Sequence, residues 1–322
     1  MIFVLIVVIA TALYTALPVI YPPENSIIND SVEYALQAES TDPATWFHPH
    51  HLLYNIIHRM GWLMLGGEQS PLRVIYIMRW TSHLCMGIVL AILFILARRM
   101  GASRPRAILL CLLLMVACSF WVFGSVAEVV APSSALVFGV IWGLFYRRDG
   151  TEPPLFNIII LGFLLGLAVT LNQLVIIYLP AFWLGMLGWH KGNRLKPIIF
   201  FSLTCILWTF VAYVLVIVLV LQIYDLSGAY QFLTTYTQWN IWGRGTFANL
   251  GDSINTLLLT QSYSYFGQHE RTLLFNLATA IPVLLAMGGL WGWTRVKAGS
   301  DWKTAWGWTV LFGLISFGFI TW

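Results

Sequence analysis

Long apolar runs recur along almost the whole chain, and they limit the folds that its 322 residues can adopt. A run of about 20 apolar residues can cross the hydrocarbon core of a bilayer as a helix. Only 9% of the residues are charged, whereas a soluble globular domain has about 25%. We therefore expect an all-α, polytopic membrane protein with about nine transmembrane helices, as a single domain over residues 1–322. The expected spans are residues 2–20, 73–97, 107–123, 130–146, 155–171, 174–189, 197–223, 273–293 and 304–320.

The first run, residues 2–20, has no Lys or Arg before it and is longer than the apolar core of a cleavable signal peptide. We expect it to be a retained first span. The cysteines form no CxxC pair and no Cys/His zinc pattern, so they are interpreted as small apolar residues inside spans. They are Cys85, Cys111, Cys118 and Cys205.

The basic residues predict which ends of the spans face the cytoplasm. If the spans alternate in direction, one side receives most of the Lys and Arg: Arg98, Arg99, Arg104, Arg106, Arg147, Arg148, Lys191, Arg194, Lys196, Arg295, Lys297 and Lys303. The other side receives most of the acidic residues. By the positive-inside rule, the N-terminus is cytoplasmic, and loops 21–72 and 224–271 face outward, to the periplasm, the exterior or a lumen. Basic clusters between apolar runs are topology signals, so no nucleic-acid partner is expected.

The two outward loops are long, whereas the cytoplasmic connections are short, and long loops are often functional. The first loop is expected to hold an amphipathic helix at residues 50–65. The second is rich in aromatic side chains, which favour the membrane interface, so we expect it to lie along the bilayer surface.

Asp30 and Glu33 lie three residues apart at the start of the first outward loop. One interpretation is a capping box, in which Asp30 accepts from first-turn amides and Glu33 reaches back to the cap. The other is a general base, with a pKa raised by burial beside a second acid. The two are compatible. Either carboxylate is also suited to a divalent cation.

Three histidines follow, His48, His50 and His51, around Pro49 and close to Tyr54. They lack the helical i, i+4 spacing of a zinc site, and no metal site is expected from them. We interpret them as hydrogen-bond donors to an anionic group such as a phosphate.

Two further polar features lie at outer ends of expected spans. Glu128 follows the third span, where an acid beside apolar membrane is a functional candidate; a carboxylate hydrated at the headgroup level is the alternative. Asn172 and Gln173 lie at the turn between the fifth and sixth spans, where they either line a pocket or satisfy backbone groups at a tight hairpin. His83, inside the second span, is expected to be hydrogen-bonded within the bundle.

The order of these features resembles the GT-C superfamily of membrane glycosyltransferases, in particular its protein O-mannosyltransferase-like branch, formerly described as a domain of unknown function. Residues 29–34 (NDSVEY) are similar to the family's D-S-x-E-[FY] motif, and residues 48–54 (HPHHLLY) to its His-Pro motif. A Ser-Phe-Trp stretch leading to Glu128 follows in the family's order, as does the polar break in residues 167–174. The similarity covers roughly the first 190 residues. The extra histidines depart from the family's pattern, and the chain lacks the C-terminal part of many members, so a shortened GT-C module is expected.

The resemblance implies a transferase that moves a sugar from a polyprenyl-phosphate donor to a protein or glycan acceptor at the outward face. It implies Asp30 as the catalytic base with Glu33 in support. The donor phosphate would be bound by His48, His50 and His51, and the pocket shaped by Glu128, Tyr54 and Asn172. No cofactor is required, although a divalent cation is compatible with the site. The absence of a Gly-rich dinucleotide fingerprint agrees with a lipid-linked donor.

Two alternatives stay open. A non-catalytic subunit of a larger membrane assembly would use the same scaffold for packing, because fold does not determine function. A lipid or solute transporter would need polar groups at mid-membrane and paired broken helices, but the expected spans have few charges at their centres and no convincing repeat.

Overall fold

The computed structural model describes residues 2–20, 25–67, 73–99, 101–115, 118–145, 153–189 and 195–234. In these ranges the secondary structure is helical, with no strand, which confirms the expected all-α class. The expected spans 273–293 and 304–320, and most of loop 224–271, lie outside the described residues.

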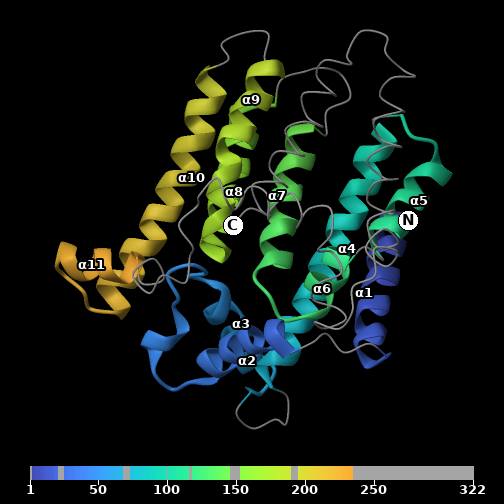
Figure 1. Ribbon diagram of the computed structural model, residues 1–322. Helices are drawn as coiled ribbons and strands as arrows, with labels where there is room; N and C mark the ends of the chain where they lie inside the picture. Colours follow the sequence, from blue (N-terminus) through green and yellow to red (C-terminus); the bar gives the residue numbers. More distant parts are fainter. Residues whose placement is uncertain are drawn as a thin grey trace, which may run out of the picture.

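Eight helices run along one another to form a bundle (Figure 1). They are α1 (Ile2–Ile20), α4 (Val74–Arg99), α5 (Arg104–Met115), α6 (Cys118–Ser125), α7 (Val130–Phe145), α8 (Leu155–Leu171), α9 (Leu179–Trp189) and α10 (Leu195–Leu215). Within the described residues, two segments of 26 residues are long and apolar enough to cross a membrane, Val74–Arg99 and Leu195–Val220. At 1.5 Å per residue each is about 39 Å long, more than the roughly 30 Å of a hydrocarbon core. The second segment is α10 continued by a π-helix, Val216–Val220.

The other expected spans are represented by shorter apolar helices, so the nine-span arrangement is not confirmed. The expected span 107–123 corresponds to α5 and α6. The expected span 174–189 begins as a 3-10 helix, Gln173–Tyr178, before α9. Asn172 explains this start, because its side-chain oxygen accepts a hydrogen bond from Leu174 N at 3.1 Å and so caps the 3-10 helix.

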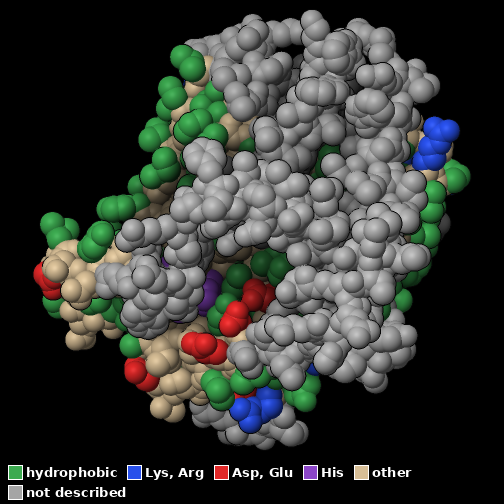
Figure 2. All heavy atoms as spheres, in the orientation of Figure 1, with side chains coloured by type: hydrophobic (Ala, Val, Ile, Leu, Met, Phe, Trp, Pro, Cys, Tyr) green, Lys and Arg blue, Asp and Glu red, His purple; other side chains and the backbone are tan. Residues whose placement is uncertain are grey.

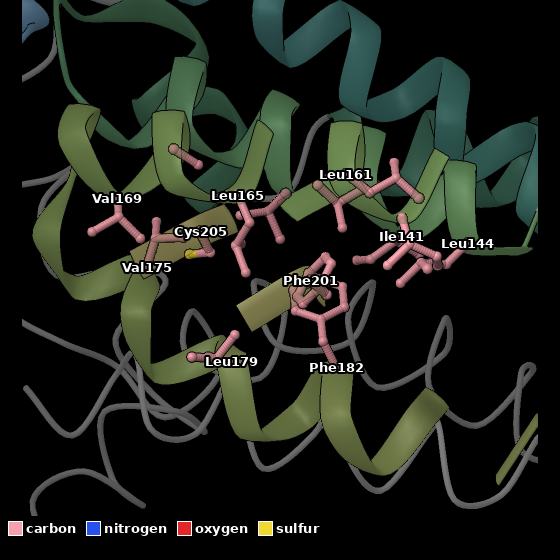
Figure 3. Packing of buried hydrophobic residues seen from close by; sticks show 14 of the residues in the cluster. Ile141, Leu144, Leu161, Leu165, Val169, Val175, Leu179, Phe182, Phe201 and Cys205 are labelled. Atoms are coloured by element: carbon pink, nitrogen blue, oxygen red, sulfur yellow. The ribbon is translucent and has the colours of Figure 1, made fainter. Parts of the chain in front are cut away.

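Close packing of α8 against α10 depends on two glycines one helical turn apart. A Cβ on Gly162 would lie 2.4 Å from the carbonyl oxygen of Phe201, and a Cβ on Gly166 would lie 2.8 Å from that of Cys205. Small residues at this spacing let helix backbones approach in apolar surroundings. Figure 3 shows the apolar cluster beside this contact, in which Leu161 and Leu165 of α8 lie among side chains of α7, α9 and α10.

A polar stripe on α4 joins that helix to the end of α6 and to the segment that follows it. His83 Nδ1 is hydrogen-bonded to Gly124 O, which confirms the bonding expected of this histidine. Because a carbonyl can only accept, Nδ1 carries the proton. Ser82 Oγ accepts from Glu128 N at 3.5 Å, and Arg79 Nε donates to Ser125 O at 3.3 Å.

Two short helices lie across one end of the bundle (Figure 1): α2 (Asn25–Glu39) and α3 (Tyr54–Met64). A 3-10 turn, Pro43–Trp46, lies between them. Helix α2 buries Ser31, Ala35 and Ala38, at spacings of four and three residues, against α3, α4 and the segment after α6. Glu39 ends α2; it pairs with Arg73 and accepts from Val74 N at 3.0 Å, which joins α2 to the first turn of α4.

Helix α3 has the reverse of the polarity of a helix on a water-soluble protein. Its buried residues include Asn55, His58 and Arg59, whereas Met60 and Met64 are 52% and 80% exposed. The apolar face of α3 therefore points away from the protein. Its polar face points into the end of the bundle, where it meets α2.

The arginines expected on the cytoplasmic side lie at the other end of α4. Arg98 and Arg99 are in its last turn, and Arg104 and Arg106 begin α5. Since α2 is joined to the first turn of α4, this basic group and the α2–α3 end are separated by the length of α4, about 39 Å.

Candidate functional site

The segment between α6 and α7, residues 126–129, connects α2 to the bundle. Ser31 Oγ of α2 donates to Ala127 O at 2.8 Å. The next residue, Glu128, is 8% exposed, and its Oε2 accepts from Val129 N at 2.7 Å, just before α7 begins. Asp30 precedes Ser31 on α2 and is exposed. The hydrogen bond between Ser31 and Ala127 thus brings together two carboxyl groups, that of Asp30, which is exposed, and that of Glu128, which is buried.

The two carboxyl groups have different protonation properties. The pKa of Glu128 is raised to about 7, chiefly by burial and to a smaller extent by the negative charge of Asp30, against the opposing effect of the hydrogen bond from Val129 N. Partial burial raises the pKa of Asp30 as well. Near neutral pH, Glu128 is therefore present in both protonation states. The Asp30 carboxylate can therefore accept a proton while the protonated Glu128 carboxyl donates a hydrogen bond.

Glu33 is held by a chain of amide groups that begins on α3. Asn55 Nδ2 donates to Gln37 Oε1 at 2.8 Å, and Gln37 Nε2 donates to Glu33 Oε1 at 3.0 Å. Glu33 lies one turn after Asp30, and both side chains are exposed. Helix α2 begins at Asn25, so Asp30 lies inside the helix and the capping-box interpretation of this pair is wrong.

The backbone of the histidine segment is fixed by three helices. Gln173 N donates to His50 O at 2.8 Å, and Leu53 N donates to Thr170 O at 3.0 Å. From α10, the Tyr213 hydroxyl donates to Pro49 O. These bonds replace the helical bonds that an earlier start of α3 would need, which is why α3 begins at Tyr54 and not at His50.

The imidazole rings form a compact group. The rings of His48 and His51 are stacked with centroids 4.0 Å apart, and the His50 ring lies 5.6 Å from that of His48. Tyr34 of α2 meets His51 edge-on at 4.5 Å, and its ring lies 5.6 Å from that of Tyr54. The structure thus brings His51 and Tyr54 against Tyr34 of α2.

Burial removes the positive charge that three histidines would otherwise supply. Burial, together with the smaller effect of a positive charge on His50, lowers the pKa of His48 to about 3. The pKa of His51 is held well below its ordinary value by burial and by the other two rings. Burial also lowers the pKa of His50, against a hydrogen bond with the Gln173 side chain. At neutral pH the segment is uncharged, and each ring can donate through one N–H.

Tyr54 connects the histidines to Glu128. Its side chain is fully buried, and its hydroxyl finds no hydrogen-bond partner among the described residues. Burial raises the pKa of this hydroxyl, and the negative charge of Glu128 raises it further. Asn172, in contrast, uses its side-chain oxygen to cap the 3-10 helix, so it supports the backbone that holds His50.

Figure 2 shows acidic and imidazole side chains gathered on one face, at the end of the molecule where α2 and α3 lie. Among the described residues, no group of three or more His, Cys, Asp or Glu side chains is arranged as a metal site.

Three residues near this site were not predicted from the sequence: Arg59, Arg79 and Tyr213. Arg59 is 7% exposed and donates through Nη1 to Ala38 O at 2.7 Å and Ser40 O at 2.8 Å. A sequence signal did exist for Arg79, because Arg79, Ser82 and His83 form a polar i, i+3, i+4 stripe in an apolar run.

Comparisons of the chain with protein-family models, curated proteins and solved structures found no match.

Proposed function

We propose that the chain is a GT-C-like glycosyltransferase that moves a sugar from a polyprenyl-phosphate donor to a protein or glycan acceptor. The observation that carries the proposal is the pair of carboxyls, exposed Asp30 and buried Glu128, beside a fixed histidine segment at one end of an apolar helical bundle. A polyprenyl donor cannot leave the bilayer, so its transferase needs acid–base groups at the membrane surface.

The proposed membrane placement is polytopic, with about nine spans, a cytoplasmic N-terminus and the α2–α3 end facing outward. Two features support it. The arginines of α4 and α5 lie at the end of α4 opposite to α2. The outer face of α3 is apolar, as expected of a helix whose surroundings are lipid and not water.

In the proposed reaction, the acceptor hydroxyl oxygen attacks the anomeric carbon of the sugar. The bond between that carbon and the phosphate oxygen breaks, and polyprenyl phosphate leaves with the electron pair. The hydroxyl proton passes to Asp30, which is exposed and has a raised pKa that suits it to accept a proton. Glu33 supports Asp30 on the same face of α2.

The remaining groups act on the donor. Neutral His48 and His50 donate N–H groups to phosphate oxygens, with His51 stacked behind His48. Protonated Glu128 donates a hydrogen bond to the sugar or the departing phosphate, and Tyr54 lies next to it.

The test is transfer by purified protein in liposomes with radiolabelled polyprenyl-phosphate sugars, run with EDTA and with Mg²⁺. Asp30→Asn should lower the rate of transfer by about 100-fold or more, the usual contribution of a general base. Asp42→Asn is the matched control, because Asp42 is an exposed acid of the same loop whose capping bond to Ala44 N an asparagine can also accept. Undiminished transfer by correctly folded Asp30→Asn would refute the role of Asp30.

A non-catalytic subunit of a membrane assembly is the second candidate, and the exposed apolar face of α10 favours it. This face includes Leu203, Leu207 and Phe210, which are 58–63% exposed. Lipid or another subunit could cover it. If wild-type protein transfers no sugar from any polyprenyl donor but purifies in a defined complex, this second function replaces the first.

A further inference from the structure

Arg79 lies on α4 five residues after the helix begins, about 8 Å along its axis. Its Nε donates to Ser125 O at 3.3 Å, and its side chain is half-buried. Within the described residues the one ion pair is between Arg73 and Glu39, so the guanidinium of Arg79 has no carboxylate partner there. An arginine is always charged, and a charge without a partner at the end of an apolar helix is costly.

The other arginines at this end of the bundle are already bound. Arg59 donates to two backbone carbonyls at the end of α2, and its guanidinium lies 4.2 Å from the centre of the Trp46 ring. Arg73 is paired with Glu39 through two nitrogens. The histidine segment is neutral. Among the described side chains of this end, Arg79 is therefore the cation with neither a carboxylate partner nor a cation–π contact.

The contacts of Arg79 place it beside the carboxyl pair. Arg79 and Ser82 lie on one face of α4; Arg79 is bonded to Ser125 O at the end of α6, and Ser82 is bonded to Glu128 N in the segment that follows. That segment also receives the bond from Ser31, the neighbour of Asp30. An anion bound to the free Nη groups of Arg79 would therefore lie close to Glu128 and Asp30, at the end of a helix long enough to cross a membrane.

We propose that Arg79 binds the phosphate of a membrane-held phosphate ester, the phosphate by which a polyprenyl donor reaches the site. This deepens the proposed function and rests on it for the identity of the lipid. A guanidinium presents two parallel N–H groups to a phosphate and forms charge-assisted hydrogen bonds, stronger than those from neutral imidazoles. A phosphate diester of a bulk lipid has the same oxygens, so the experiment must separate the two sources.

The experiment measures phosphate-lipid binding by native mass spectrometry of the protein in phosphatidylcholine nanodiscs. The probes are a polyprenyl monophosphate, phosphatidylglycerol at the same mole fraction, and inorganic phosphate. Wild-type protein should retain polyprenyl monophosphate, and Arg79→Gln should weaken that binding by about 10- to 100-fold, the range for hydrogen bonds to charged groups. Arg106→Gln, an exposed arginine at the opposite end of α4, is the matched control and should bind as wild type does.

Each outcome is decisive. Equal Arg79-dependent binding of phosphatidylglycerol would uphold the phosphate site and assign it to bulk lipid. No binding by wild type, or binding unchanged in Arg79→Gln, would overturn the proposal. If Arg79→Gln does not fold, Arg79→Lys replaces it. Lysine keeps the charge but loses the paired N–H groups, so a smaller loss of affinity for polyprenyl monophosphate is expected. Unchanged affinity in Arg79→Lys would overturn the proposal. Retained binding without sugar transfer would refute the proposed function and leave the phosphate site intact.

Discussion

Replacing Glu128 by glutamine should remove a pH dependence of stability that burial of this carboxyl creates. The pKa of Glu128 is about 7 in the fold and 4.5 when unperturbed. Between these values the folded protein holds a proton that the unfolded chain has released, so wild-type stability falls as the pH rises through this window and levels off above it. At 1.36 kcal/mol per pH unit, the difference amounts to about 3 kcal/mol.

Glutamine resembles the protonated side chain, and its amide oxygen can still accept from Val129 N. Glu128→Gln should therefore match wild type near pH 4.5 and exceed its free energy of unfolding by about 3 kcal/mol at pH 8. Both proteins would be unfolded in micelles at a series of pH values and their difference taken, which cancels other titrating groups. Glu33→Gln, an exposed carboxyl on α2, is the matched control. A constant difference between Glu128→Gln and wild type at every pH would show that Glu128 is already ionised in the fold.

Two further substitutions test the packing that positions the site. Gly162→Ala brings a Cβ to 2.4 Å from Phe201 O and should lower the free energy of unfolding by about 1–3 kcal/mol in the same assay. Gly139→Ala, where nothing lies within 4 Å of the added Cβ, should raise it by up to about 1 kcal/mol through helix propensity. Equal effects of the two substitutions would contradict the close α8–α10 contact. Arg59→Met removes two hydrogen bonds from a charged donor and the contact with Trp46, so the free energy of unfolding should fall by about 2–4 kcal/mol. Arg59→Lys should lose less, because lysine keeps the charge. A Met variant as stable as wild type would show that the buried charge contributes nothing to stability.

Apolar runs bounded by polar or proline-containing segments were predicted closely from the sequence. Residues 155–171 form α8, and residues 2–20 form α1, with the expected bounds. In these runs the local pattern decides, because no long-range bond competes with the helix. The expected helix 50–65 begins four residues later, at Tyr54. The backbone oxygen of His50 and the backbone N–H of Leu53 are hydrogen-bonded to Gln173 and Thr170, which are distant in sequence, and so are not available to an earlier helical turn.

The electrostatics of the site could not be predicted in the same way. The sequence predicts His48, His50 and His51 as hydrogen-bond donors to an anionic group, but it does not show that burial keeps these rings uncharged. Their burial depends on Tyr34 of α2 and on α10, and no sequence pattern gives those contacts. The polar face of α3 shows the same limit: periodicity predicts an amphipathic helix, but not which of its faces meets the bundle.

The central claim is that the polar cluster lies at the membrane surface, with the outer face of α3 in lipid. Nitroxide labels at Met64 and at Thr41, an exposed residue of the 40–47 loop, would be compared in nanodiscs, after replacement of the four native cysteines. The measurement is the collision rate of each label with oxygen, which concentrates in lipid, and with a water-soluble nickel chelate. We expect the label at position 64 to meet oxygen and exclude nickel, and the label at position 41 to meet nickel. A label at position 64 as accessible to nickel as that at position 41, or shielded from both reagents, would contradict the claim.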